Sequence, residues 1–279
     1  MTRSLTGMTV LITGASSGIG AALAEVLAQQ GARLALVARR RDKLEALVAR
    51  LSGSGHLVIP ADVADPRACA GAIAQACSAF GRLDTLVCNA GYGLVAGIAA
   101  TDEEQWLAIL RTNLLGTTAC IRAAAPLLLV QPLRDGWRGQ VMIVSSALAR
   151  RGRPDAGAYS ATKAAQLSVA EALRIEWAEQ RIAVTSVHPI HTDTEFHGAA
   201  AGRRWLVGAA EPRQTPAHVA ARMVAAIRRP QAEVWPHRGS RWALALGALW
   251  AWPIDRYLTR RLAEERAAVL SPETAKSKG

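Results

Sequence analysis

Short apolar runs alternate along the chain with longer amphipathic runs that have the spacing of helices. The predicted strands cover residues 9–13, 33–38, 57–60, 85–88, 140–145, 182–187 and 233–235. The first six runs lack the polar alternation of a half-exposed strand, which is typical of strands that helices cover on both faces. The predicted helices cover residues 18–30, 42–51, 66–80, 103–129, 158–180 and 216–228.

The order of these elements predicts an α/β fold, a Rossmann-like doubly wound parallel sheet of about seven strands with helices on both faces. Asp65-Pro66 and Thr215-Pro216 mark two helix starts, because each places a capping side chain before a proline in the first turn. We expect a single domain over residues 1–236, a C-terminal helical extension over 237–270 and a disordered tail over 271–279.

The composition narrows the possible partners. The 279 residues are 51% hydrophobic, which suffices for one large core, and the formal net charge is +11. Basic side chains are compatible with nucleic-acid binding, but here they are scattered except at Arg39, Arg40 and Arg41. Only 5% of the residues are aromatic, and the sequence has no zinc-finger spacing or RNA-binding aromatic motif. We therefore expect no nucleic-acid partner.

The four cysteines, Cys69, Cys77, Cys88 and Cys120, form no C-x-x-C pair. They fall on predicted helices and strands, so buried free thiols are expected rather than a disulfide framework or a zinc site. The first predicted strand follows the N-terminus so closely that no signal peptide is expected. These features predict a reducing, cytoplasmic setting.

A glycine-rich turn, Thr13-Gly14-Ala15-Ser16-Ser17-Gly18-Ile19-Gly20, joins the first predicted strand to the first helix. Gly14 permits the sharp turn, Gly18 lets backbone approach a pyrophosphate, and Gly20 lets helix and sheet pack closely. The helix N-terminus then offers free N–H groups to phosphates. The spacing is G-x-x-x-G-x-G instead of the usual G-x-G-x-x-G. Its place between strand and helix predicts a nucleotide cofactor.

Tyr159 and Lys163 are four residues apart in a predicted helix, so their side chains lie on one face. An ammonium group stabilises a neighbouring phenolate and so lowers the pKa of the phenol. Tyr159 is therefore a candidate proton donor and acceptor. The same spacing is common on solvated helices, and the pair alone leaves both interpretations open.

Several motifs occur together in a fixed order. They are the turn at residues 13–20, Asn89-Ala90-Gly91, Asn113, Ser146, and Tyr159 with Lys163. Together they resemble the classical short-chain dehydrogenase/reductase (SDR) family over about residues 8 to 235. The intervals from Ser146 to Tyr159 and from Tyr159 to Lys163 both fit that family. The resemblance implies that residues 1–236 bind a dinucleotide and carry out catalysis.

The implied reaction is reversible hydride transfer between nicotinamide and a carbonyl or secondary alcohol. Tyr159 would be its acid and base, and Lys163 would lower the pKa of Tyr159 and hold the nicotinamide ribose. Ser146 would bind the substrate oxygen; Ser145 is the competing serine, but the family interval favours Ser146. Asn113 would support, through its carbonyl, a water that links Lys163 to solvent.

The end of the second predicted strand indicates which cofactor is used. It carries Ala38, where a carboxylate would favour NAD, and Arg39 and Arg40 follow. Guanidinium groups pair with a 2′-phosphate, so NADP(H) is expected over NAD(H), although arginines at a helix start can also be simply solvated. The cofactor-binding residues implied by resemblance are Gly14, Ser16, Ser17, Gly18, Ile19, Gly20, Arg39, Arg40, Asp62, Val63, Asn89, Ala90, Gly91, Tyr159, Lys163, Pro189 and Thr194.

One departure from the family lies after the sixth predicted strand. Pro189 and Thr194 fit the pattern, with Thr194 expected at the nicotinamide carboxamide, but Ile190 replaces the usual glycine. A β-branched residue does not easily adopt a positive φ and narrows the space beside the nicotinamide. His188 and His191 lack the further ligands of a metal site, and no metal is expected.

The substrate is expected in an apolar pocket beside Ser146 and Tyr159. The resemblance implies that residues 195–213 close over it, and the small residues of this segment suit a mobile lid. The candidate pocket residues are Tyr92, Leu94, Leu148, Phe196, Trp205 and Leu206. None of them identifies the substrate, which is expected to be a small carbonyl or alcohol compound, lipophilic in character.

The C-terminal region is strongly apolar over residues 241–254 and amphipathic over 255–261. The apolar run is too short for a spanning helix, which needs about 20 residues. Three interpretations stay open: packing within the subunit or across a dimer, a helix at a membrane interface, and a lid over a lipophilic site. The resemblance implies a homodimer or homotetramer. For the whole chain, a non-catalytic cofactor-binding protein or a membrane-surface protein of the same fold is the alternative.

Overall fold

The computed structural model describes residues 2–192 and 213–270. Seven strands form one sheet of order β3-β2-β1-β4-β5-β6-β7, and every neighbouring pair is parallel. The strands are β1 Thr9–Thr13, β2 Arg33–Ala38, β3 Leu57–Pro60, β4 Thr85–Cys88, β5 Gly139–Val144, β6 Ile182–Val187 and β7 Glu233–Val234. The predicted doubly wound fold is confirmed. Thr194, Phe196, Trp205, Leu206 and the predicted tail 271–279 lie outside the described residues.

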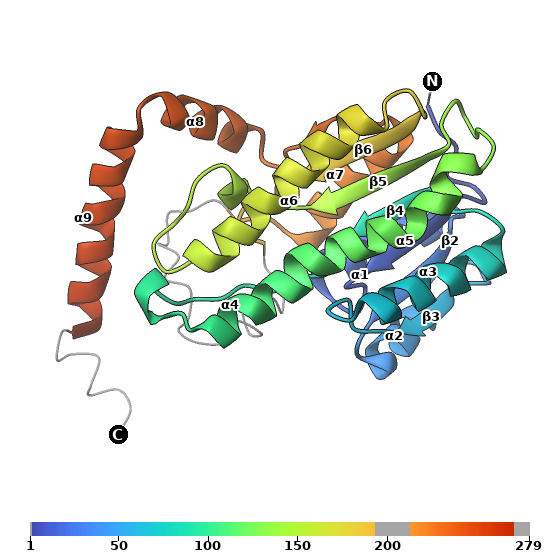
Figure 1. The fold of residues 1–279 in the computed structure, drawn as a ribbon, viewed down its shortest axis with the longest axis horizontal. Coiled ribbons are helices and arrows are strands. Elements are labelled where there is room, and N and C mark those ends of the chain that lie inside the picture. The colour runs from blue at the N-terminus through green and yellow to red at the C-terminus, as the bar shows by residue number, and fades with distance from the viewer. Residues whose placement is uncertain (1, 193–212, 271–279) are drawn as a thin grey trace.

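Two layers of helices cover the sheet (Figure 1). The helices are α1 Gly18–Gln29, α2 Arg41–Val48, α3 Pro66–Phe80, α4 Glu103–Leu110, α5 Gly116–Val130, α6 Gly157–Glu176, α7 Pro216–Arg228, α8 Arg238–Leu249 and α9 Ala251–Leu270. Val10 and Ile12 of β1 belong to the core that includes α1 and α7, whereas Leu11 belongs to the core that includes α3 and α5. This alternation explains why the strands are apolar throughout.

The long helix predicted at residues 103–129 is interrupted. α4 and α5 are joined by a π-helical turn, Arg111–Leu115, and Asn113 lies buried inside it. Such wide turns are frequent at functional sites. The run Glu103–Val130 is also the one described helix with the length and apolarity to cross a bilayer. In its most apolar window 44% of the residues are buried inside the protein, and a helix of a protein core meets the same criteria.

Other element boundaries shift by a few residues. β5 begins at Gly139, one residue before the predicted start, and α6 ends at Glu176 rather than at residue 180. The chain after α6 turns back toward β6 through Arg181, whose φ of 55° is incompatible with a continuing helix. The four cysteines are free thiols, of which Cys77 alone is partly exposed.

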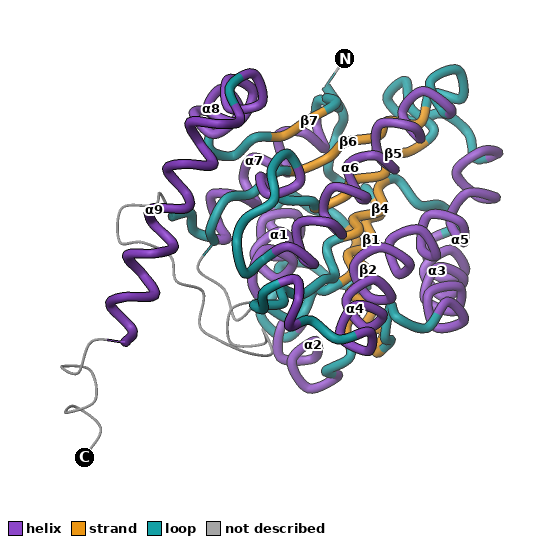
Figure 2. The backbone as a smooth tube through the Cα atoms, turned by 60° about the vertical axis from the view of Figure 1, so that its left-hand side comes forward, coloured by secondary structure: helices purple, strands orange, loops and turns teal. Residues whose placement is uncertain are grey.

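Two helices, α8 and α9, follow β7, and α9 projects away from the sheet (Figures 1 and 2). The break at Trp250 follows from Pro253, whose ring would clash with the carbonyl of Leu249 in a continuous helix. In the first turn of α9 the missing N–H of Pro253 has no such cost. α8 packs closely on α9 at Gly247, where an added Cβ would clash with Ile254 Cδ1.

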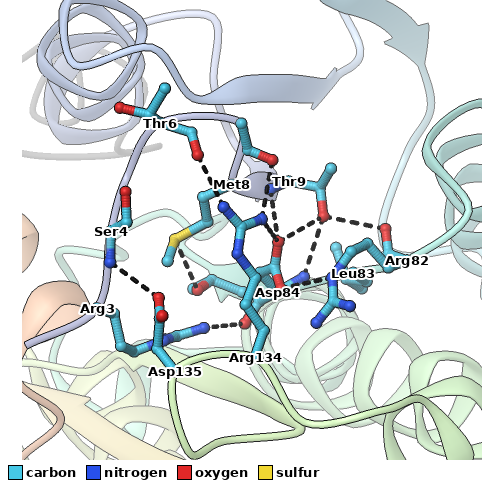
Figure 3. A network of polar contacts seen from close by, with 12 residues as sticks. Arg3, Ser4, Thr6, Met8, Thr9, Arg82, Leu83, Asp84, Arg134 and Asp135 are labelled. Carbon is cyan, nitrogen blue, oxygen red and sulfur yellow. Dashed lines mark hydrogen bonds and ion pairs between the residues drawn. The ribbon is translucent and has the colours of Figure 1, made fainter. Parts of the chain in front are cut away.

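A polar network anchors the N-terminal segment at the amino ends of the central strands (Figure 3). Arg3 is buried and donates to Gln140 Oε1 at 2.9 Å and to the carbonyl of Asp84 at 3.0 Å. The buried Asp84 carboxylate pairs with Arg82 Nε at 2.8 Å and with Arg134 Nη1 at 3.0 Å. These bonds tie the segment before β1 to the starts of β4 and β5.

Candidate active site

A cavity of about 1000 Å³ opens at the carboxyl ends of the strands. β1 and β4 are neighbours there, and the chain leaves them toward opposite edges of the sheet, which is where ligands bind in doubly wound folds. The sequence-predicted residues that line the cavity are Gly14, Ser16, Ser17, Gly18, Ile19, Arg39, Arg40, Asp62, Val63, Asn89, Ala90, Gly91, Tyr92, Ser146, Leu148, Tyr159, Lys163 and Pro189. Gly20, Leu94 and Asn113 lie behind this wall.

The glycine turn is built for close backbone approach. Gly14 has a φ of 65°, and an added Cβ would lie 2.8 Å from the Cα of Ala90. A Cβ on Gly20 would lie 2.4 Å from the carbonyl oxygen of Gly14. Asn89 Nδ2 donates to the carbonyls of Thr13 and Gly14, at 3.0 and 3.1 Å, so Asn89 fixes the turn to the end of β4. No side chain caps α1, and its first N–H groups are therefore available to a phosphate.

Positive charge gathers at the end of β2. Arg40 Nη2 lies 3.2 Å from Ser16 Oγ and 3.4 Å from Ser17 Oγ. Arg39 and Lys43 line the same part of the cavity, and Ala38 stands where a carboxylate would repel a phosphate. The glycine turn, the uncapped N-terminus of α1 and the basic side chains after β2 together fit a dinucleotide that carries phosphates.

Ser146 and Tyr159 meet in the cavity wall. Ser146 follows β5, Tyr159 lies in the first turn of α6, and their hydroxyl groups are hydrogen-bonded. Ser145 is used otherwise, because its hydroxyl donates to the backbone carbonyl of Lys163 at 2.8 Å. Of the two candidate serines, Ser146 is therefore the one whose hydroxyl faces Tyr159.

Burial sets the proton affinities of Tyr159 and Lys163. It lowers the pKa of Lys163 to about 7, because the ammonium loses hydration. Burial also raises the pKa of Tyr159 to about 12, while the hydrogen bond with Ser146 opposes this rise. The lowered pKa predicted for Tyr159 is thus wrong for this structure, since Lys163 Nζ lies 5.6 Å from the centre of the phenol ring and desolvation dominates.

Gln166 joins the site without having been predicted from the sequence. Lys163 Nζ donates to the carbonyl of Val144 at 2.8 Å and to Gln166 Oε1 at 2.9 Å. Gln166 Nε2 in turn donates to the carbonyl of Asn113 at 2.6 Å. A side-chain amide therefore links Lys163 to Asn113, the link that the resemblance assigns to a water. The spacing 159, 163, 166 on one helix face was the available signal.

Asn113 organises the surroundings of this chain of contacts. Its side chain accepts from the N–H of Tyr92 and donates to the carbonyl of Tyr92 and to Thr162 Oγ1, each at 3.0 Å. The loop after β4 is thereby joined to α6. Leu94, predicted at the substrate, packs in the core cluster with Ile109 and Tyr159 instead of lining the cavity.

The departure at Ile190 is accommodated without left-handed backbone. Ile190 has no positive φ, lines the cavity and donates its N–H to Gln214 Oε1 at 3.3 Å. His188 is buried and stacks on Trp235 at 4.4 Å between ring centres. Its ring nitrogens face the carbonyl of Ser146 at 3.2 Å and Ser186 Oγ at 3.0 Å.

Burial lowers the pKa of His188 to about 4, so the ring is neutral and positions the backbone of Ser146. Among the described residues, no group of three or more His, Cys, Asp or Glu side chains is placed to hold a metal ion.

Known proteins place the chain in a family. A family model described as short chain dehydrogenase matches residues 8–204. Over 233 residues the chain is 35% identical to the glycine betaine reductase ATRR of Emericella nidulans; the match covers 81% of this chain and 18% of that relative. Over 271 residues it is 33% identical to an uncharacterized oxidoreductase of Mycobacterium tuberculosis, covering 93% of this chain and 100% of the relative.

Two solved structures share the fold and hold a nicotinamide dinucleotide. A short chain dehydrogenase from Burkholderia cenocepacia in complex with NADP has a TM-score of 0.76 and 26% identity, over 92% of this chain and 99% of that one. A 3-ketoacyl-(acyl-carrier-protein) reductase from Brucella melitensis complexed with NADH has a TM-score of 0.73 and 27% identity, over 83% and 97%. The chain belongs to the short-chain dehydrogenase family of oxidoreductases, and a nicotinamide cofactor is supported.

Proposed function

We propose that this protein is an NADP(H)-dependent oxidoreductase that transfers a hydride between its cofactor and a carbonyl or secondary alcohol compound. One observation carries the proposal: Ser146, Tyr159 and Lys163 converge on a single cavity whose other end is the glycine turn and the basic end of β2. A cavity of about 1000 Å³ has room for a dinucleotide and a second molecule.

The residues that would hold the cofactor follow from the geometry. The glycine turn and the N-terminus of α1 would bind the pyrophosphate, and Arg39 and Arg40 would bind a 2′-phosphate. Lys163 has a third N–H beyond its bonds to Val144 and Gln166, which would hold the nicotinamide ribose. When bound, the nicotinamide supplies or accepts the hydride.

Tyr159 and Ser146 would handle the substrate oxygen. With a pKa of about 12, Tyr159 is protonated at neutral pH and donates its proton as the carbonyl oxygen becomes an alkoxide. Ser146 would donate a second hydrogen bond to the same oxygen and stabilise its developing charge. The phenolate left behind would be stabilised by the ammonium of Lys163, which Gln166 connects to the Asn113 carbonyl. The proposed role of Asn113 is therefore to supply, through its carbonyl, the next group of a proton relay that begins at Lys163.

Replacing the Tyr159 hydroxyl tests the proposal. Tyr159→Phe should lower kcat by at least about a hundredfold, the low end for general acid catalysis. NADPH binding, followed by quenching of protein fluorescence, should persist because the ring remains. Undiminished turnover in this variant would refute the assignment. Bound NADPH with no turnover of any carbonyl by the wild type would instead favour the non-catalytic alternative.

The cofactor preference has its own test. The basic side chains after β2 support NADP, so kcat/KM should be higher with NADPH than with NADH. The double variant Arg39→Ala/Arg40→Ala should lower kcat/KM with NADPH by at least about tenfold, the loss of one or two charge-assisted hydrogen bonds, and leave NADH nearly unchanged. A wild-type preference for NADH would contradict this part of the proposal.

A homodimer or homotetramer in the cytoplasm completes the proposed function. Leu129 and Val130 at the end of α5 and Ile175 at the end of α6 are large apolar side chains exposed to solvent in the single chain. Exposed apolar groups on neighbouring helices favour contact between copies. Sedimentation analysis of the full chain measures this, and a monomer at micromolar concentration would contradict it.

A further inference from the structure

We propose that α8 and α9 dock the protein on an anionic phospholipid bilayer, and that the substrate is a lipophilic carbonyl or alcohol compound that enters the cavity beside these helices. The substrate part rests on the proposed function; the docking part does not. The two helices have an inner face toward the cavity and an outer face toward solvent, and each face carries part of the argument.

The inner face belongs to the cavity wall. Leu244 of α8 and Ile254 and Leu258 of α9 line the same cavity as Tyr159. Ile254 and Leu258 are one turn apart on one side of α9 and are partly buried, whereas the residues between them are exposed. A wall of leucine and isoleucine side chains at the mouth favours an apolar molecule.

The outer face is apolar and open. Trp242, Leu246 and Leu249 follow the spacing of one face of α8, and all three are exposed. Trp250 and Trp252 add two further indoles at the junction with α9. The three tryptophans expose 67–69% of their surface. Single exposed apolar residues are ordinary, but this many large ones along one short segment indicate an interaction surface.

The positive charge of α8 and α9 indicates which kind of partner the apolar outer face binds. Cζ of Arg241 lies 5.9 Å from the centre of the Trp242 ring, and Cζ of Arg256 lies 5.6 Å from the centre of the Trp252 ring. Residues 238–270 hold six arginines and three carboxylates. Tryptophan beside arginine is the pairing found at the headgroup level of bilayers, and anionic lipids attract such a surface. A second copy would bring like charges together.

The helices are held to the rest of the protein at a defined place. Arg151, in the loop before α6, forms an ion pair with Asp255 and donates to the carbonyl of Ala251 at 3.3 Å. Arg151 also lines the cavity. One of the three carboxylates in residues 238–270 is thus paired with the body of the protein, so six arginines and two other carboxylates remain on this segment. A bilayer on the outer face would lie next to the cavity mouth.

Vesicle binding of the full chain tests the docking. The protein should co-sediment with vesicles of phosphatidylcholine and phosphatidylglycerol, bind pure phosphatidylcholine vesicles at least about tenfold more weakly, and be released by high salt. The variant Trp242→Ser/Trp250→Ser/Trp252→Ser should lose at least about tenfold in vesicle affinity. A matched control, Leu107→Ser/Leu133→Ser, removes exposed leucines elsewhere and should bind vesicles like the wild type.

Several results would overturn the docking. The first is that the wild type does not bind anionic vesicles. The second is that the tryptophan variant binds them as tightly as the wild type. The third is that the control loses as much vesicle affinity as the tryptophan variant. If the wild type is a dimer that does not bind vesicles and the tryptophan variant is a monomer, the surface is an interface with a second copy of the chain. Equal thermal unfolding temperatures of the three proteins confirm that the substitutions act on the surface.

Turnover separates the substrate part from the proposed function. With NADPH, the tryptophan variant should reduce a short water-soluble ketone like the wild type, because the three indoles lie outside the cavity wall. Its rate on a long-chain aldehyde dissolved in anionic vesicles should fall at least about tenfold with its vesicle affinity. Equal rates on the vesicle-borne aldehyde would overturn the substrate part. Vesicle binding without turnover of either compound would overturn the proposed function and leave the docking in place.

Discussion

Two buried polar clusters lie at opposite ends of β4 and β5. At the amino ends, Arg3, Asp84 and Arg134 form a network of charged groups that joins three segments of the chain (Figure 3). At the carboxyl ends, Tyr159 and Lys163 are also buried, and Lys163 Nζ donates to two neutral acceptors, the carbonyl of Val144 and Gln166 Oε1.

The difference between the clusters lies in what compensates burial. Asp84 is surrounded by guanidinium and N–H donors, which compensate the burial of its carboxylate. Lys163 has two neutral acceptors, and burial therefore lowers its pKa to about 7. The amino-end cluster joins segments of the chain, whereas the carboxyl-end cluster opens on a cavity and contains Lys163, whose lowered pKa lies near neutral pH. The first arrangement suits folding and the second suits proton transfer.

The largest expected effect is on folding. Asp84→Asn removes the charge that compensates Arg82 and Arg134, and the free energy of unfolding should fall by about 3–5 kcal/mol, as for other broken buried pairs. Denaturant titration measures it, and kcat of the folded fraction should stay near the wild type. Asp135→Asn is the control, since Asp135 is exposed and its carboxylate accepts from the N–H of Ser4 (Figure 3). Equal stability of both variants would contradict a structural role for Asp84.

Next comes a pair of neighbouring serines at the carboxyl end. Ser146→Ala should lower kcat by about a hundredfold to a thousandfold, because a donor to the developing oxyanion is lost. Ser145→Ala should stay within about tenfold, since Ser145 donates only to the backbone of Lys163. Steady-state kinetics with NADPH and a soluble ketone measures both. The reverse order would show that the wrong serine is assigned.

The shifted pKa of Lys163 predicts how stability depends on pH. Between about pH 7 and pH 10, Lys163 is neutral in the folded protein and still protonated in the unfolded chain, whose lysine pKa is the ordinary 10.5. The unfolded state then binds more protons, and stability rises with pH in this window. Below pH 7 both states are protonated, and the contribution is constant. Lys163→Met should lose this rise in denaturant titrations at several pH values; an unchanged slope would contradict the low pKa.

The smallest expected effect concerns Gln166 as a positioning residue. Gln166→Leu removes one acceptor from Lys163, which should lower kcat/KM by about tenfold or less and move the pH limit that Lys163 sets toward lower pH. Gln166→Glu places a negative charge there and should move the same limit toward higher pH. Opposite shifts of this limit in the pH profile of kcat/KM indicate that Gln166 positions Lys163. If Gln166 served only in packing, neither variant would move the limit.

Much of this molecule could be predicted from local sequence. The apolar runs predicted all seven strands to within about two residues, because each strand is buried on both faces and tolerates few polar residues. The glycine turn and the Tyr159–Lys163 spacing located the cavity wall, since turn geometry and helical period act over a few residues. The π turn around Asn113 was missed, because nothing in its local sequence distinguishes it from a continuing helix.

Local sequence determined which functional groups follow which elements along the chain. They are a turn for phosphates after β1, basic groups after β2, a serine after β5 and the phenol–ammonium pair on α6. Only the tertiary structure decided which distant groups meet. Gln166 reaches Asn113 across 53 residues, Arg3 reaches Gln140 across 137, and α8 and α9 join a cavity that begins at Gly14. Burial also decided the proton affinities of Tyr159 and Lys163, because the loss of hydration depends on everything packed around a group and not on its neighbours in sequence.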